Sequence, residues 1–233
     1  MKEDTPSVKV IDTLRAIEPR AWNALAAGNP FLRHEFLHAL HETGCAREST
    51  GWSPCYLTLW QSASLVGAMP LYAKSHSYGE YVFDWAWADA YHRHGLSYYP
   101  KLLGAIPFSP VTGPRLLARD GETRALLVRA ALRLSLEVSS LHVLFPTELE
   151  AREMETAGMM LRRSVQFHWE NRGYANFDEF LSDLASAKRK KIRQERRRVR
   201  ETGVQVRRLT GAEIRDEHWS FFTRCYNNTY RAH

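Results

Sequence analysis

The chain has 233 residues, of which 44% are hydrophobic and 12% aromatic, and its formal net charge is +6. This composition supports a folded core and excludes a disordered chain. No run of about 18 apolar residues occurs, and the N-terminal segment MKEDTPSVKV lacks the apolar stretch of a secretory signal, so the sequence predicts neither a transmembrane helix nor an exported protein.

The cysteines favour a reducing compartment. The chain has three of them, Cys45, Cys55 and Cys225, which is an odd number at wide spacing. They form neither a disulfide framework nor a CxxC metal site. We therefore predict a cytoplasmic location.

The positive charge is concentrated in one segment. Lys188 to Arg200 contains nine Lys or Arg residues and one Glu, a net charge of +8. The rest of the chain therefore carries a net −2, the difference from the total of +6. The basic character belongs to this segment and not to the protein as a whole.

The N-terminal part of the chain alternates strand-like and helix-like segments. The predicted elements are a strand at Val8–Leu14, a helix from Pro19, a helix at Phe31–Thr43, and a hairpin of Cys55–Trp60 and Leu65–Lys74. Pro70 predicts an edge or a bulge in the second strand of this hairpin, because proline has no N–H to donate.

An aromatic segment follows from Tyr81 to Tyr99, where seven aromatic residues are interleaved with acids and histidines. Such a segment is typical of an aromatic core with a polar rim, and also of a cleft wall for a sugar or a nucleotide. His92 and His94 have no third ligand nearby, so they are weak evidence for a metal site, and we predict none.

The segment that follows predicts a mixed α/β sheet. Four prolines and two glycines between Tyr99 and Ala118 exclude a regular helix and predict an extended, kinked strand. The next predicted elements are a helix at Thr123–Val138, a buried strand at Leu141–Phe145, a helix from Pro146 to Gly158, and a strand at Met160–Trp169. This alternation of strands and helices is typical of mixed α/β domains.

The organisation changes from Asn176 onwards. The predicted elements are a short helix at Phe177–Leu184, a basic helix at Ser186–Thr202, a strand at Val204–Leu209, and a helix at Ala212–Tyr230. The last helix carries an aromatic stripe that must pack against a partner. One strand and one helix cannot hold a core, so we expect the chain to contain only the start of a second domain.

The basic helix leaves three interpretations open. Its cations repel one another at helical spacing, and an anionic partner would offset that repulsion. The helix is a solvated linker between domains, a phosphate-binding element, or a nucleic-acid-binding element. Lys190 and Arg193 are the candidate phosphate-binding residues on it.

Familiar catalytic and nucleotide-binding motifs are absent. The sequence has no G-x-S-x-G nucleophile motif, no phosphate-binding G-x-x-x-x-G-K loop and no G-x-G-x-x-G dinucleotide motif. His168, between Phe167 and Trp169, is either a structural residue or a catalytic base.

Several segments carry a resemblance to a known family. Pro107–Arg115, which reads PFSPVTGPR, resembles the signature PFTPVTGPR of the proteobacterial FemAB-like family. The same family's second signature is resembled by Gln166–Trp169, Asn171, Tyr174, Phe177–Leu184 and Lys188–Arg197. Asn29–Leu37 also fits, and these segments occur in the expected order over most of the chain.

The resemblance implies a fold and a reaction class. The family looks like a distant relative of the Fem transferases, which use two tandem GNAT-like domains to move an aminoacyl group from aminoacyl-tRNA onto an amine of a peptidoglycan precursor. It implies a GNAT-like mixed sheet flanked by helices in residues 1–175. Connecting helices then occupy 176–203, and an incomplete second GNAT-like domain begins at 204–233.

The implied function is an N-acyl- or aminoacyl-transferase that acts on a cell-envelope precursor and is inactive as these 233 residues alone. Acyl-CoA and aminoacyl-tRNA are the candidate donors, and the candidate acceptor is a small-molecule or nucleotide-sugar-linked amine. The pyrophosphate loop of GNAT enzymes that use acyl-CoA does not occur in the chain, which leaves the donor open. A tRNA-binding module and a non-catalytic protein of GNAT fold are the alternatives.

Aminolysis of an ester or thioester needs a neutral amine, a polarised carbonyl and a route for the proton. The candidate catalytic residues are Asp84, Asp89 and His168. The candidates for binding phosphate, diphosphate or carboxylate are Arg115, Lys190 and Arg193, and those for binding the rest of the substrate are Trp85 and Tyr91.

Overall fold

A computed structural model describes residues 6–82 and 84–232 of the chain. The chain divides into two compact units, Met1–Ser164 and Val165–His233. The predicted connecting helices 176–203 and the predicted second domain 204–233 both fall within the second unit.

The first unit contains all the strands found among the described residues. The strands are β1 (Ser7–Ile11), β2 (Trp52–Pro54), β3 (Tyr56–Gln61), β4 (Ser64–Met69), β5 (Leu71–Lys74), β6 (Lys101–Gly104), β7 (Leu117–Ala118) and β8 (Leu141–Val143). The helices of this unit are α1 (Pro19–Leu25), α2 (His34–Glu42), α3 (Trp85–Arg93), α4 (Gly121–Leu134) and α5 (Glu148–Thr156).

The strands form two four-stranded sheets, with the orders β1-β3-β4-β7 and β2-β5-β6-β8. All pairs are antiparallel except β6 with β8. The first unit is therefore a mixed α/β domain, as predicted. The kinked segment from Tyr99 to Ala118 provides only the short strands β6 and β7, which belong to different sheets. Its prolines cannot donate to a hydrogen-bond ladder, so no long strand forms.

The predicted hairpin is confirmed for β3 and β4, but Pro70 splits its second strand. β4 ends at Met69, and β5 begins at Leu71 and joins the other sheet. Proline donates no hydrogen bond to a ladder, so the chain leaves one sheet and enters the next at this residue.

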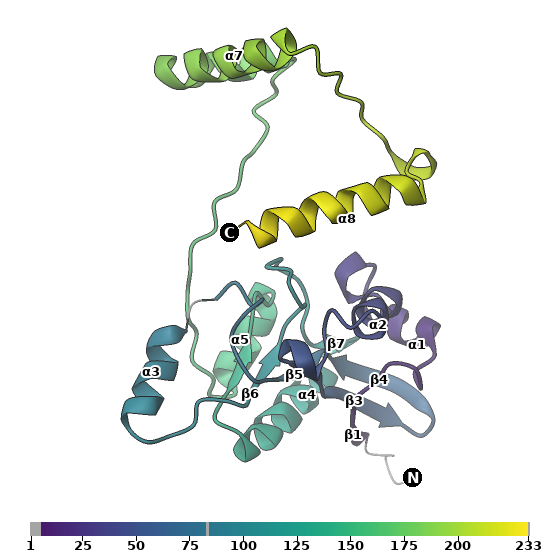
Figure 1. The fold of residues 1–233 in the computed structure, drawn as a ribbon. Coiled ribbons are helices and arrows are strands. Elements are labelled where there is room, and N and C mark those ends of the chain that lie inside the picture. The colour runs from purple at the N-terminus through teal and green to yellow at the C-terminus, as the bar shows by residue number, and fades with distance from the viewer. Residues whose placement is uncertain (1–5, 83, 233) are drawn as a thin grey trace. The chain divides into compact units, whose positions relative to one another are not determined.

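Helices cover both faces of the sheets (Figure 1). Trp22 of α1 and Leu37 of α2 are buried in one core cluster, whereas Leu127 of α4 and Met154 of α5 are buried in another. Residues of one strand alternate between the two clusters, since successive side chains of a strand point to opposite faces. Full burial of a side chain of this size contributes roughly 1.5–3 kcal/mol.

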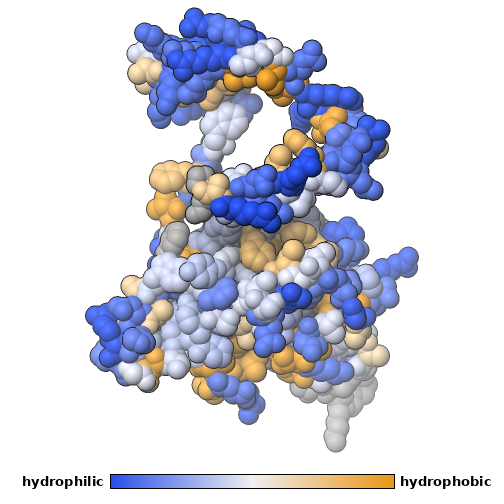
Figure 2. All heavy atoms as spheres, viewed as in Figure 1, coloured by the Kyte–Doolittle hydropathy of each residue, from blue (hydrophilic) through white to orange (hydrophobic). Residues whose placement is uncertain are grey.

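The second unit consists of helices joined by irregular segments. Its helices are α6 (Phe177–Ser182), α7 (Ser186–Glu201) and α8 (Asp216–Arg231). Leu181 is the one fully buried hydrophobic side chain among the described residues of this unit. Figure 2 shows the region of α7, at the top of the view, as mostly hydrophilic with smaller hydrophobic patches. None of the described helices is long and apolar enough to cross a membrane.

Two predicted strands are wrong. Residues of Met160–Trp169 and of Val204–Leu209 are irregular in the structure, and most of their side chains are exposed. Their alternating sequence suits a strand, but no neighbouring strand pairs with either segment among the described residues. Without a pairing partner an alternating pattern cannot form a sheet.

Candidate active site

Two lysines lie side by side inside the first unit. Lys74 on β5 and Lys101 on β6 are directly opposite each other, and Trp52 on β2 lies opposite Lys74 on its other side. Residues directly opposite in a sheet share a face. Both lysines are buried, with 0% and 1% exposure. Like charges at opposite positions are destabilising, so the surroundings must compensate them.

Lys101 is held by acidic and hydroxyl groups from the segment between β5 and α3. Its Nζ donates to Ser77 Oγ at 2.9 Å, to Glu80 Oε2 at 2.9 Å and to Asp84 Oδ2 at 2.5 Å. Glu80 and Asp84 are themselves buried. We call Lys74, Glu80, Asp84 and Lys101 the lysine cluster. A buried ion pair persists only with such additional hydrogen bonds.

The two carboxyls of the lysine cluster differ in acidity. Burial opposes ionisation of Asp84, but hydrogen bonds from Lys101, Ser77 and Tyr98 outweigh it and lower its pKa. Burial raises the pKa of Glu80, although the charges of Lys101 and Lys74 oppose the rise. Environments that move the pKa values of two neighbouring carboxyls apart are typical of acid–base sites.

The positive charge of Lys74 has fewer polar partners than that of Lys101 among the described residues. Its Nζ lies 3.7 Å from the ring centroid of Trp52 and donates to the carbonyl oxygen of Tyr78 at 3.3 Å. Burial lowers the pKa of Lys74 to about 8. The negative charge of Glu80 acts to raise this pKa, whereas the positive charge of Lys101 lowers it further. The amine of Lys74 is therefore partly neutral near physiological pH.

Three buried polar atoms around the cluster lack a hydrogen-bond partner among the described residues: Glu80 Oε1, Asp84 Oδ1 and Trp52 Nε1. An unpartnered buried polar group costs about 1–3 kcal/mol. Buried polar groups without a partner are therefore often found at functional sites, where a ligand or a catalytic role accounts for them.

The first family signature contacts Trp52 and the segment that carries Glu80, and its backbone is strained at the point of contact. Phe108, within Pro107–Arg115, has φ +57°, and its ring centroid lies 5.3 Å from that of Trp52. Its N–H donates to the carbonyl of Gly79 at 3.3 Å, beside the segment that carries Glu80. Tyr81 also has a positive φ of 59°. Left-handed conformations of bulky residues cost about 1–3 kcal/mol each and cluster at functional sites.

Arg115 is fully buried and holds the signature in shape. Its guanidinium donates to the carbonyl oxygens of Val111 at 2.6 Å, Gly113 at 3.0 Å and Leu144 at 2.8 Å. The carboxylate of Glu150 accepts from the backbone N–H of Arg115 at 2.8 Å. Burial lowers the pKa of Arg115 to about 10, and Glu150 opposes this. The structure thus places this predicted anion-binding residue inside the domain, with carbonyl oxygens as its partners.

Helix α3 brings some of the predicted residues to the cluster and not others. Asp84 immediately precedes α3. On the helix, the ring centroid of Trp85 lies 5.3 Å from that of Tyr78. The ring centroid of Tyr91 lies 5.1 Å from that of Tyr98. Tyr98 in turn donates to Asp84 at 2.8 Å. Asp89 is exposed and pairs with Arg93 one turn along the helix, at 3.1 Å.

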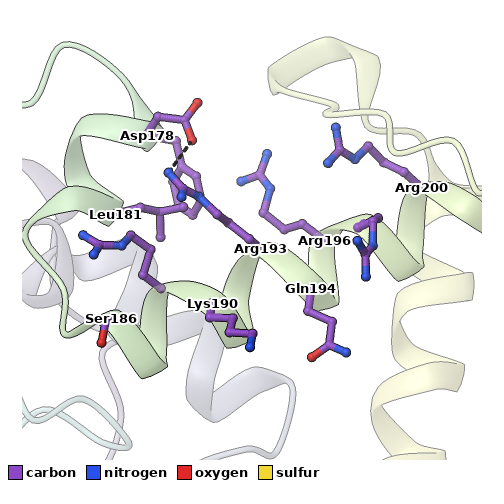
Figure 3. A pocket seen from close by; sticks show the side chains of 11 residues that line it. Asp178, Leu181, Ser186, Lys190, Arg193, Gln194, Arg196 and Arg200 are labelled. Carbon is purple, nitrogen blue, oxygen red and sulfur yellow. Dashed lines mark ion pairs between the residues drawn. The ribbon is translucent and has the colours of Figure 1, made fainter.

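Lys190 and Arg193 lie in the second unit, beside a pocket of about 620 Å³ between α6 and α7. The cations that line this basic pocket are Arg189, Lys190, Arg193, Arg196, Arg197 and Arg200. Arg193 turns towards Asp178 of α6, at 3.8 Å, whereas Lys190 projects from the other side of α7 (Figure 3). Arg196 lies 4.2 Å from the ring centroid of Phe177.

His168 lines a different pocket of the second unit, about 350 Å³ in volume. The lining residues are His168, Trp169, Glu170, Arg172, Tyr174, Phe180, Asp183 and Leu184, and we call this the aromatic pocket. The three candidate catalytic residues are therefore divided: Asp84 and Asp89 belong to the first unit and His168 to the second.

The segments that line these sites fall within one family match. A model of the FemAB-like family, described as peptidoglycan biosynthesis/recognition, matches residues 13–233. The chain belongs to the FemAB-like family. Its members act in peptidoglycan biosynthesis or recognition, so the site belongs to a protein of cell-wall metabolism. No curated protein and no solved structure matches the chain.

Three members of the lysine cluster of this FemAB-like protein were not among the sequence candidates: Lys74, Glu80 and Lys101. The available signal was a lysine at the end of one strand-like apolar run, Leu71–Lys74, and another at the start of a second, Lys101–Gly104. A lysine is almost never fully buried unless it is paired. Only the register of β5 and β6 shows that the two lysines are neighbours.

Within residues 6–82 and 84–232, no group of three or more His, Cys, Asp or Glu side chains could hold a metal ion.

Proposed function

We propose that this FemAB-like protein transfers an acyl or aminoacyl group onto an amine of a peptidoglycan precursor, and that the first unit is a GNAT-like domain with its reaction centre at the lysine cluster. The observation that supports this most strongly is the hydrogen bond from Phe108 N–H of the family signature to the carbonyl of Gly79. Gly79 immediately precedes Glu80, which is one of two buried carboxyls that differ in acidity. The alternative of a non-catalytic GNAT-fold protein gives no reason to retain buried carboxylate oxygens that lack a hydrogen-bond partner within residues 6–82 and 84–232.

The proposed chemistry is aminolysis of an acyl-CoA thioester or an aminoacyl-tRNA ester. The amine nitrogen of the acceptor attacks the carbonyl carbon, a C–N bond forms, and the C–S or C–O bond of the donor breaks. The proton lost by the amine passes to a carboxylate of the cluster, and the leaving thiolate or alkoxide takes up a proton in turn. Glu80 Oε2 is anchored on Lys101, which leaves Oε1 as the proton-accepting oxygen.

The substrate reaches this centre when the segment from Tyr78 to Val82 moves. Glu80 is 3% exposed, whereas Tyr78 and Tyr81 of the same segment are 67% and 59% exposed. A closing segment excludes water from the reaction and completes the set of catalytic groups.

Turnover by the protein at its natural length tests the proposal. Release of free CoA, or of deacylated tRNA, is measured with a peptidoglycan-precursor amine as the acceptor. We expect Glu80→Gln to lower kcat by about 10²–10⁴-fold and to remove the acidic limb of the pH–rate profile. Glu148→Gln is the matched control, because Glu148 is exposed on α5 and pairs with the exposed Arg152.

A loss of stability is separated from a loss of catalysis by the melting temperature of each variant. A folded Glu80→Gln protein with an unchanged kcat and an unchanged pH–rate profile would remove Glu80 from the mechanism. Failure of the protein to consume either donor would reject the transferase function.

A second function, binding of a nucleic acid such as tRNA, is favoured by one observation in the second unit. Arg189, Arg193, Arg196 and Arg200 follow one another at helical spacings of four, three and four residues on α7. Arg193, Arg196 and Arg200 project from the same side of the helix (Figure 3). A row of this kind extends over about 16 Å, since each helical residue rises about 1.5 Å, and therefore suits a chain of phosphates.

The salt dependence of RNA binding tests this second function. Replacing Arg193, Arg196 and Arg200 by Ala should lower the slope of log K against log salt by about 2–3, since each phosphate contact contributes about 0.7–0.9. Arg129, Arg133 and Arg152 of the first unit, replaced together by Ala, form the control of equal charge. An equal decrease of the salt slope in both triple variants would mean that RNA binding depends only on the net charge of the protein.

A further inference from the structure

The aromatic pocket of the second unit has walls of a particular kind. The ring of Phe180 lies 6.1 Å from that of Trp169 at an interplanar angle of 84°, and 5.6 Å from that of Tyr174 at 75°. The ring of Phe180 thus meets each of the other two rings at a near right angle, and all three rings line the pocket. Trp169 is nevertheless 67% exposed, and a large ring in contact with water at a pocket wall indicates a surface that takes a ligand.

The charge of the aromatic pocket is opposite to that of the basic pocket. Two carboxylates, Glu170 and Asp183, line it together with one guanidinium, that of Arg172. The basic pocket has six cations and the single carboxylate of Asp178. The aromatic pocket therefore attracts cations, although it lies in the most basic part of the chain.

The carboxylate of Asp183 contacts two other residues that line the pocket. It accepts a hydrogen bond from the hydroxyl of Tyr174 and lies 3.3 Å from the Arg172 guanidinium. The Arg172 side chain is 77% exposed, so its pairing with Asp183 is a weak surface contact. A better-placed cation can displace it.

Local hydrogen bonds hold the irregular wall of the pocket in place. The side-chain oxygen of Asn171 accepts from the N–H groups of Gly173 and Tyr174, both at 3.1 Å. Asn176 accepts from Glu179 N–H at 3.0 Å at the start of α6, and Glu179 accepts from Ala175 N–H at 2.7 Å. This wall is thus held in place without a ligand, which reduces the entropic cost of binding.

We propose that the aromatic pocket binds the ammonium group of an alkyl primary amine, with Trp169, Tyr174 and Phe180 around the cation and Asp183 as its counter-ion. Aromatic faces attract a cation, and a carboxylate gives it a charge-assisted hydrogen bond. The proposal concerns binding of the amine alone and goes beyond the transferase function. The imidazole of His168 lines the same pocket.

Binding of n-butylammonium to the purified protein, followed in ¹H–¹⁵N spectra of the indole N–H groups, tests the proposal without any turnover. The chain has seven Trp residues, and Trp169→Phe identifies the signal of Trp169. We expect n-butylammonium to shift that signal and n-butanol, which has the same length and no charge, to bind at least about tenfold more weakly.

Two charge variants are expected to act in opposite directions. Asp183→Asn should weaken binding of n-butylammonium about tenfold, because it removes the counter-ion. Arg172→Ala should tighten binding severalfold, because it removes the competing guanidinium, and an unfolded variant could not give that result. Asp178→Asn is the matched control, since Asp178 lies in the first turn of α6, the helix that Asp183 caps, but lines the basic pocket.

Equal binding of n-butanol, equal weakening by Asp178→Asn, or weaker binding in Arg172→Ala would each overturn the proposal. Turnover with an unshifted Trp169 signal would reject the pocket and leave the transferase function standing. A specific shift in a protein that consumes neither donor would support amine binding and reject the transferase function.

Discussion

At the scale of single residues, burial sets the charge state of Lys74. Its ammonium has one carbonyl oxygen and the face of Trp52 as neighbours, and no carboxylate within bonding distance in the described structure. Lys101, its neighbour across the sheet, takes the contacts with Glu80 and Asp84. The two lysines therefore respond differently to pH and to substitution.

The pH dependence of stability should report the charge of Lys74. Its pKa in the folded protein is about 8, below the ordinary value of 10.5, so between these values the unfolded chain binds more protons than the folded one. The free energy of unfolding should therefore rise with pH in this interval, by up to about 1.4 kcal/mol per pH unit.

Urea unfolding of the wild type and of Lys74→Met at pH 7.5, 8.5 and 9.5 measures this effect. Burial also raises the pKa of Cys55 to about 12, which acts in the opposite sense above pH 9, but that contribution is common to both proteins. The difference between the two curves isolates Lys74. Parallel curves would show that Lys74 keeps an ordinary pKa.

Replacement of Lys101 should be far more damaging than replacement of Lys74. Lys101→Met leaves the buried carboxylates of Glu80 and Asp84 without their cation, at a cost of about 3–5 kcal/mol. Lys74→Met removes a charge that no carboxylate of the described residues contacts, so at pH 7 it should be neutral or stabilising. Thermal unfolding of the two variants at pH 7 tests this, and equal destabilisation would contradict it.

At the scale of elements, the contact of α4 with β4 depends on a missing side chain. A Cβ on Gly67 would lie 2.9 Å from Thr123 Cγ2 and 3.4 Å from Leu127 Cδ1, both on α4. Gly67 is buried, so α4 cannot move away without opening the core beneath it. The close approach of helix and strand explains why glycine is found there.

Gly67→Ala should destabilise the protein by about 1–3 kcal/mol through overpacking. Adding Thr123→Ser removes the contacting methyl group and should restore part of the loss. Chemical denaturation of the single and double variants measures both values. If Thr123→Ser restores nothing in the Gly67→Ala background, the contact with α4 is not the cause.

At the scale of the whole molecule, the core is confined to one unit. Both clusters of buried hydrophobic residues lie within the first unit, whereas α8 leaves Trp219, Phe222, Tyr226 and Tyr230 from 51% to 70% exposed. The free energy of local opening follows the burial of apolar contacts. The two units should therefore differ in stability.

Amide hydrogen exchange should show this difference directly. We expect backbone N–H groups of β3, β5 and α4 to exchange only through global unfolding, and those of α7 and α8 to exchange through local opening at much lower free energy. Mass spectrometry of peptides from each element gives the protection. Equal protection of α8 and α4 would mean that α8 packs against a partner in solution.

The sequence by itself determined the periodic elements and the family. Alternating and helical patterns placed most strands and helices because these patterns depend on neighbours along the chain. The signature Pro107–Arg115 and the basic run from Lys188 were likewise readable without a structure. Met160–Trp169 was mispredicted because strand formation also requires a pairing strand, which a local pattern does not report.

Only the tertiary structure decided which of these residues meet. Asp84 was a candidate from its aromatic surroundings, but its partner Lys101 is brought to it by the register of β5 with β6 and by the segment that returns from β5. Arg115 was expected to bind an anion, and the structure surrounds it with carbonyl oxygens. Burial and long-range pairing set these charges and contacts, and both are properties of the folded chain rather than of any segment of it.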